Sequence, residues 1–107
     1  MKNIDYPLDK FLEYSKSKPE QLMFVDFMAS WCGPCKIIKP FIHDLEENYP
    51  SVEFLLVNCD DDEREDIMDH FNVSALPTFI LIRNAEVVNS VLGIKEEDIE
   101  NAINDSL

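Results

Sequence analysis

Runs of apolar residues predict the strands of a sheet. Residues 22–28 are apolar except for Asp26, a pattern typical of a strand buried on both faces. Residues 52–59 form a second run of this kind. Residues 78–82 and 87–92 flank a tetrapeptide, so they predict the two strands of an antiparallel hairpin.

Around these strands, apolar residues recur at the three- and four-residue spacing of amphipathic helices. The predicted helices cover residues 8–18, 34–49, 60–69 and 95–104. Pro19 ends the first helix, and Pro40 is expected to kink the second because proline removes a backbone donor and crowds the preceding turn. The order of helices and strands predicts one α/β domain over residues 1–107, built on a mixed sheet.

The composition excludes several classes of function. The 107 residues include 9 Lys and Arg against 22 Asp and Glu, which gives a net charge of −13. Such an acidic chain lacks the basic face that binding to nucleic acid or to an anionic membrane requires. No segment has the pattern of a signal peptide, and no run approaches the ~18 apolar residues of a membrane span. We therefore expect a cytoplasmic monomer that binds neither nucleic acid nor membrane.

The candidate chemistry lies in Trp31–Lys36, between the first buried strand and the long helix. Cys32 is placed at the helix N-terminus, where free N–H groups and the helix dipole stabilise a thiolate, so it is expected to be the exposed nucleophile. Cys35 follows one turn later as the shielded partner, close enough for a disulfide. Gly33 is expected to permit the turn, and Pro34 suits the first helical turn. This pattern favours thiol–disulfide exchange.

Other interpretations of the cysteine pair remain open. A zinc site would need further ligands, and the candidates Cys59, His43 and His70 have neither a second Cys-x-x-Cys nor a His-x-x-x-His spacing. The pair can also be a static disulfide or two structural cysteines. We interpret Cys59 as a buried structural thiol, and the acidic run over residues 60–66 as a solvated surface.

The sequence closely resembles the thioredoxin family over nearly its whole length. The residues that carry the resemblance are Phe24–Phe27, Ala29, Trp31–Lys36, Pro40, Ala75–Thr78 and Gly93. The resemblance implies the thioredoxin fold, with a central mixed β-sheet flanked by helices on both faces, and protein-disulfide reductase activity with no bound cofactor. It also implies re-reduction by a flavin-containing, NADPH-dependent thioredoxin reductase. Thioredoxins are themselves the reference case for this Cys-x-x-Cys chemistry.

The resemblance gives a role to Asp26, the one acid in the first buried strand. In thioredoxins the matching carboxylate lies beneath the cysteine pair and takes the proton of the resolving thiol, directly or through water, so Asp26 would serve Cys35. The family often places a Lys or Glu on the neighbouring strand, where this chain has Leu56. Without a cation there, desolvation is expected to raise the pKa of Asp26. The alternative is an acid that reaches water at a strand edge.

The resemblance also implies a substrate-binding surface. Its residues would be Trp31, Gly33, Pro34, Leu76, Pro77 and Gly93. Pro77 would follow a cis peptide bond, and Leu76 would offer its backbone to the substrate as a short added strand. From the residues alone, Trp31 can instead be a core side chain and Gly93 a strand terminator.

Three functions follow from these interpretations. The leading one is a disulfide reductase whose partners are disulfide-containing target proteins and thioredoxin reductase. A disulfide oxidase or isomerase would use the same cysteine pair, whereas a binding subunit would use the surface and leave the cysteines incidental. Gly33-Pro34 within the pair and the missing signal peptide favour the reductase.

Overall fold

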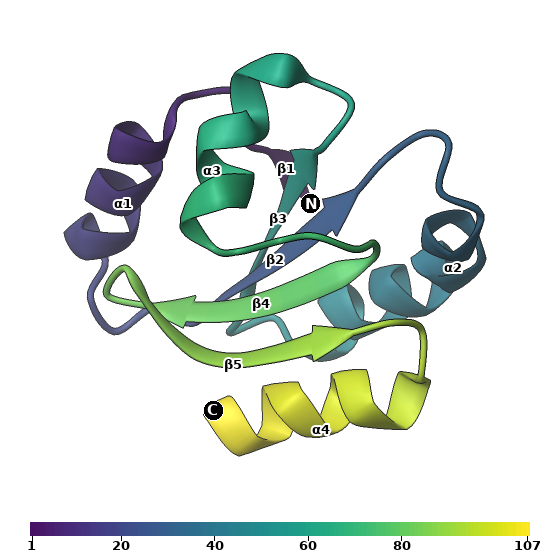
Figure 1. The fold of residues 1–107 in the computed structure, drawn as a ribbon. Coiled ribbons are helices and arrows are strands. Elements are labelled where there is room, and N and C mark those ends of the chain that lie inside the picture. Colours follow the sequence, from purple (N-terminus) through teal and green to yellow (C-terminus); the bar gives the residue numbers. More distant parts are fainter.

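The computed structural model describes residues 1–107, and its centre is a five-stranded sheet in the order β1-β3-β2-β4-β5 (Figure 1). The strands are β1 (Lys2–Asn3), β2 (Met23–Met28), β3 (Glu53–Asn58), β4 (Thr78–Arg83) and β5 (Glu86–Leu92). β1, β3 and β2 are parallel, whereas β4 is antiparallel to β2 and β5 is antiparallel to β4. The predicted mixed sheet is confirmed. The sequence pattern does not predict β1, because two residues carry no periodicity.

Helices cover both faces of the sheet, as expected. The first pair, α1 (Leu8–Ser17) and α3 (Glu65–His70), packs on one face, and α2 (Gly33–Asn48) and α4 (Glu96–Ser106) pack on the other (Figure 1). α2 continues through Pro40. None of the helices combines the length and the apolar character that a membrane crossing would require.

The third helix begins later than the pattern over residues 60–69 predicts. A short 3-10 helix, η1 (Asp62–Arg64), precedes α3. Asp61 lies before η1, and its Oδ1 accepts a hydrogen bond from the N–H of Glu63 at 3.0 Å. Aspartate often caps helices in this way, so part of the acidic run starts a helix instead of continuing one.

β2 divides the interior into two cores. Met23, Val25 and Phe27 pack in the core beneath α1 and α3, whereas Phe24 packs in the core beneath α2 and α4. Because side chains alternate along a strand, Asp26 points to the same face as Phe24. The strand pattern therefore directs one carboxylate toward the helix that begins with the cysteine pair.

The turn between β4 and β5 contains an alanine in the left-handed region. Asn84 and Ala85 have φ angles of 54° and 65°. The N–H of Ala85 donates to Oγ of Ser15 at 2.8 Å, which holds the turn against α1. Asn-Ala stands here in place of the Asn-Gly that suits such turns, and the positive φ of Ala85 is unfavourable for a residue that carries a Cβ.

We predict that Ala85→Gly stabilises the protein by roughly 1 kcal/mol, because glycine adopts a positive φ without a Cβ clash. Urea denaturation of both proteins measures the difference. The control is Ala102→Gly in the middle of α4, where glycine costs about 1 kcal/mol relative to alanine and should destabilise the protein. If the free energy of unfolding changed in the same direction in both variants, the result would contradict strain at Ala85.

Candidate active site

Cys32 and Cys35 form a disulfide at the start of α2. Their Cα atoms are 5.3 Å apart, within the range that a disulfide requires. Cys32 is the N-cap residue of α2, and its Sγ accepts a hydrogen bond from the N–H of Cys35 at 3.2 Å. The helix N-terminus therefore presents a backbone donor to the sulfur of Cys32, in the position that favours an anion.

Two expectations about this segment are wrong. Cys32 and Cys35 are both buried, with exposed fractions of 4% and 6%, so exposure does not distinguish a nucleophile in the disulfide form. Gly33 has no positive φ, and a Cβ at this position would meet no atom within 4 Å. The turn therefore does not require the conformational freedom of glycine.

The predicted substrate-binding residues lie around the cysteine pair or on segments tied to it. Leu76 packs against the cluster that contains both cysteines, and the Leu76-Pro77 peptide bond is cis, as the resemblance implies. The N–H of Gly93 donates to the carbonyl oxygen of Pro77 at 3.0 Å, and a φ of 102° makes glycine the suitable residue there. Trp31 is 73% exposed, so its interpretation as a core side chain is wrong. Pro34 is exposed beside it in the first turn of α2.

Asp26 is buried under the start of α2 and does not reach the edge of the sheet. Its exposed fraction is 9%, and its Oδ1 has no hydrogen-bond partner. Burial raises its pKa from the ordinary 3.8 to about 7, and the nearby cation Lys39 partly opposes this rise. Leu56 is its neighbour on β3, as expected, and burial is the main cause of the raised pKa, which confirms the prediction. The sequence did not predict that a cation would act on Asp26 from another element. The cation comes from α2.

A cavity of about 200 Å³ joins Asp26 to Cys35. Ile42 and Leu56 contribute apolar wall, and Lys39 contributes a charged group. A bound water needs only roughly 10–15 Å³ of such space and two or more polar partners. The cavity is therefore large enough for water to link the carboxyl group to the sulfur of Cys35.

The third cysteine lies next to this site. Cys59 is partly buried and packs against the cysteine pair and Ala29, and its N–H donates to the carbonyl oxygen of Met28 at 2.7 Å. Burial, together with the carboxylates of Asp26 and Asp60, raises the pKa of Cys59 to about 11. Its thiol therefore stays protonated near neutral pH, which fits a structural role.

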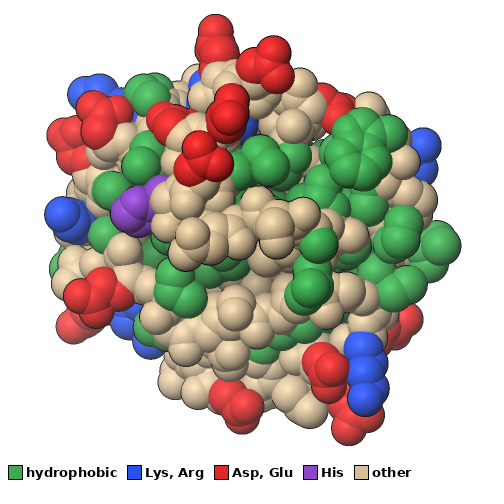
Figure 2. All heavy atoms as spheres, in the orientation of Figure 1, with side chains coloured by type: hydrophobic (Ala, Val, Ile, Leu, Met, Phe, Trp, Pro, Cys, Tyr) green, Lys and Arg blue, Asp and Glu red, His purple; other side chains and the backbone are tan.

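Sequence reasoning missed the contact that ties the acidic run to the site. Asp60 accepts a hydrogen bond from the N–H of Ser30 at 2.9 Å through Oδ2. Hydrogen bonds from Ser30 and Trp31 lower the pKa of Asp60. Figure 2 shows acidic side chains gathered over η1 and α3, beside hydrophobic side chains on the side where β2 leads into α2. The first acid of the run is therefore part of the site's framework.

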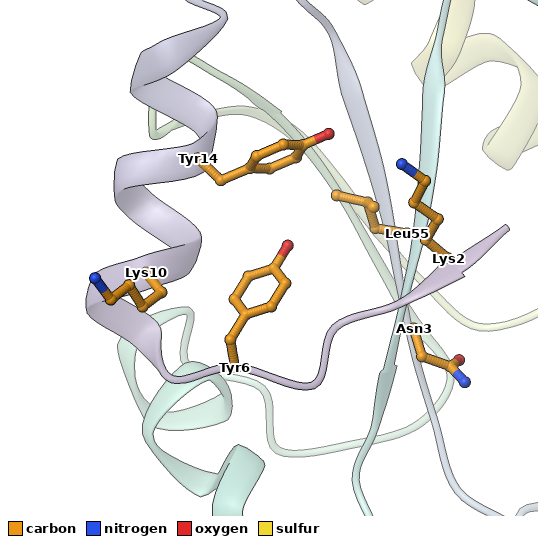
Figure 3. A pocket seen from close by; sticks show the side chains of 6 residues that line it. All are labelled: Lys2, Asn3, Tyr6, Lys10, Tyr14 and Leu55. Carbon is orange, nitrogen blue, oxygen red and sulfur yellow. The ribbon is translucent and has the colours of Figure 1, made fainter.

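A wider hollow lies away from the cysteines, between α1 and β1 (Figure 3). It has a volume of about 410 Å³ and is lined by Lys2, Asn3, Tyr6, Lys10, Tyr14 and Leu55. The hydroxyl of Tyr14 donates to the carboxylate of Glu53. None of the predicted site residues lines this hollow, so it is separate from the active site at the cysteine pair. No group of three or more His, Cys, Asp or Glu side chains is placed to hold a metal ion.

Comparison with known proteins identifies the family. The family model described as Thioredoxin matches residues 8–105. The chain belongs to the thioredoxin family. It is 41% identical over 96 residues to the thioredoxin of Ophiophagus hannah, which covers 90% of each chain. It is also similar to the structure of Fasciola hepatica thioredoxin, with a TM-score of 0.88, 30% identity and 98% of each chain covered.

One further neighbour is a structure of a complex between ferredoxin:thioredoxin reductase and thioredoxin f2. The TM-score is 0.87 at 28% identity, with 98% of this chain and 91% of the other covered. Membership of the thioredoxin family confirms the predicted fold and the predicted reaction. The chain is a thiol-disulfide oxidoreductase that acts on disulfide targets through a Cys32-Cys35 redox-active disulfide.

We predict that Asp26→Asn stabilises this thioredoxin above neutral pH. A carboxyl group whose pKa is about 7 when folded and 3.8 when unfolded binds more protons in the folded state. Its contribution to the free energy of unfolding is therefore complete below about pH 4. This contribution is lost as the pH rises through 7, and the loss is on the order of 4 kcal/mol. Urea denaturation between pH 4 and pH 8 should show that Asp26→Asn removes most of this loss.

Asp69→Asn is the matched control for this measurement, because Asp69 is an exposed acid of α3. It should keep the wild-type dependence of unfolding free energy on pH. An Asp26→Asn protein that also keeps the wild-type dependence would show that the carboxyl group is not desolvated.

Proposed function

We propose that the chain reduces disulfides in other proteins and recovers its own electrons from a thioredoxin reductase. The observation that carries this proposal is the placement of the redox disulfide. Cys32 caps α2, while Cys35 faces a cavity that ends at a buried carboxyl group. A nucleophile stabilised by a helix N-terminus and a second thiol served by a base are the two parts that reduction by dithiol exchange requires.

The proposed mechanism has two exchanges. The thiolate of Cys32 attacks one sulfur of the target disulfide, a mixed disulfide forms, and the other target sulfur leaves as a thiolate. Cys35 then loses its proton to ionised Asp26 and attacks Sγ of Cys32. The Cys32-Cys35 disulfide forms, and the target leaves with both sulfurs reduced. Two electrons have passed from the chain to the target.

The target is proposed to lie across the exposed rim of the site. Leu76 would pair its backbone with the target as a short added strand, a common way in which proteins bind extended peptides. Trp31, Gly33, Pro34 and the Pro77–Gly93 contact would surround the target disulfide. The exposure of Trp31 and the packing of Leu76 against the cysteine cluster support this placement.

The proposed electron donor is a flavin-containing, NADPH-dependent thioredoxin reductase. A ferredoxin-linked reductase is the second candidate, because a protein with a similar structure is seen in complex with ferredoxin:thioredoxin reductase. We further propose that the protein is a monomer in the cytoplasm. The reducing environment there would preserve the free thiol of Cys59.

Insulin reduction tests this function directly. With NADPH and a thioredoxin reductase, or with dithiothreitol alone, the chain should accelerate the precipitation of reduced insulin. The same assay with reduced ferredoxin and its reductase tests the second donor. A chain that does not accelerate reduction by any donor, but keeps a partner when both cysteines are replaced by serine, would be a binding subunit instead.

We predict that Cys35→Ser accumulates mixed disulfides with target proteins through Cys32, because the second exchange is lost while the first remains. Non-reducing gel electrophoresis and mass spectrometry of the trapped species identify the bonded cysteine. Cys59→Ser is the control and should trap nothing. Mixed disulfides that form through Cys35 in a Cys32→Ser protein, and not in Cys35→Ser, would reverse the roles of the two cysteines.

A further inference from the structure

The cavity that contains Asp26 is lined on one side by side chains of α2. Cys35, Lys39 and His43 follow one another at intervals of four residues, so they share one face of the helix. All three line the cavity. Lys39 and His43 are exposed, whereas Asp26 is buried. The exposed part of the lining therefore carries Lys39 and His43, and the buried part carries an acid.

The strands beside Asp26 supply no charge to it. Its Cα partners are Leu56 on β3 and Phe79 on β4. The titratable and charged groups that line the cavity or act on Asp26 are Cys35, Lys39, His43 and Cys59, with the Met1 ammonium paired to Glu46 at 2.7 Å. Lys39 makes no ion pair of its own. It is thus the ammonium group of this cavity that has no carboxylate partner in an ion pair.

We propose that Lys39 is the positioning residue for Asp26: from the facing helix it favours the ionised carboxylate that receives the proton of Cys35. Leu56, the neighbour of Asp26 on β3, carries no charge, so the cation comes from α2 instead. The attraction is effective because the carboxyl group is desolvated, so its interaction with a nearby cation is less screened than in water. The proposal rests on the role proposed for Asp26 in the second exchange.

The proton balance shows why this charge matters. The thiol of Cys35 becomes a thiolate only as Asp26 changes from carboxylate to carboxylic acid, so a protonated Asp26 cannot accept the proton. Burial brings the pKa of Asp26 to about 7 against the opposing effect of Lys39. Without Lys39 the pKa should rise further. A rise of one unit would lower the ionised fraction at pH 7 from roughly one half to about one tenth.

The test is the titration of the Asp26 carboxyl carbon, followed by NMR in the oxidised protein. Lys39→Met should raise the midpoint by at least about half a pH unit, and Lys39→Arg should keep it within a few tenths of the wild-type value. Lys36→Met is the matched control, because Lys36 is an exposed lysine of the same helix that does not line the cavity. A Lys39→Met midpoint equal to that of the wild type, or an equal shift in Lys36→Met, overturns the proposal.

A kinetic measurement separates this proposal from the mechanism on which it rests. The rate at which a preformed mixed disulfide with Cys32 is resolved should follow the same midpoints, so Lys39→Met should shift the pH profile upward and Lys39→Arg should restore it. If the NMR midpoint shifts and the kinetic profile does not, Lys39 sets the charge of Asp26 as proposed, and the role of Asp26 as proton acceptor is what fails.

Discussion

A carboxyl group held out of water at the centre of the sheet is the constraint on which the site depends. Asp26 lies on β2, between β3 and β4, and α2 covers its face of the sheet. An isolated buried carboxylate is unfavourable, so the fold keeps a group that weakens it at neutral pH. The compensation is chemical. In the proposed mechanism, the same burial that raises the pKa of Asp26 toward neutrality would make it a usable base for Cys35.

The connection between β2 and α2 brings the reacting groups together with few residues. β2 ends at Met28, and Cys32 already caps α2. Two hydrogen bonds with the residues that follow β3 hold this connection in place. The N–H of Cys59 donates to the carbonyl oxygen of Met28, and the N–H of Ser30 donates to the carboxylate of Asp60. The acidic segment thus has a structural role beside the site. The free thiol of Cys59 next to it is kept protonated mainly by its burial, with a smaller effect of the carboxylates of Asp26 and Asp60.

Most of the fold and the cysteine chemistry could be predicted from the sequence, because apolar runs, helical spacing and the Cys-x-x-Cys motif are local patterns. Other features depend on contacts between distant segments. The spacing of Lys39 from Cys35 places them on one helix face, but only the packing of α2 on β2 brings Lys39 to Asp26. The hydrogen bond from the N–H of Ser30 to the carboxylate of Asp60 joins two loops. The burial of Cys32 also depends on segments that fold over it, and helix position alone says nothing about it.

The most direct test of this account compares the titration of Asp26 in the oxidised and the reduced protein, using the carboxyl carbon resonance. If the carboxyl group and the thiol of Cys35 share one cavity and exchange a proton, they titrate as a coupled pair. Reduction should then raise the midpoint of Asp26, because a thiolate nearby disfavours a second negative charge. The same midpoint in both redox states would contradict the account, since it would separate the buried acid from the chemistry of the cysteine pair.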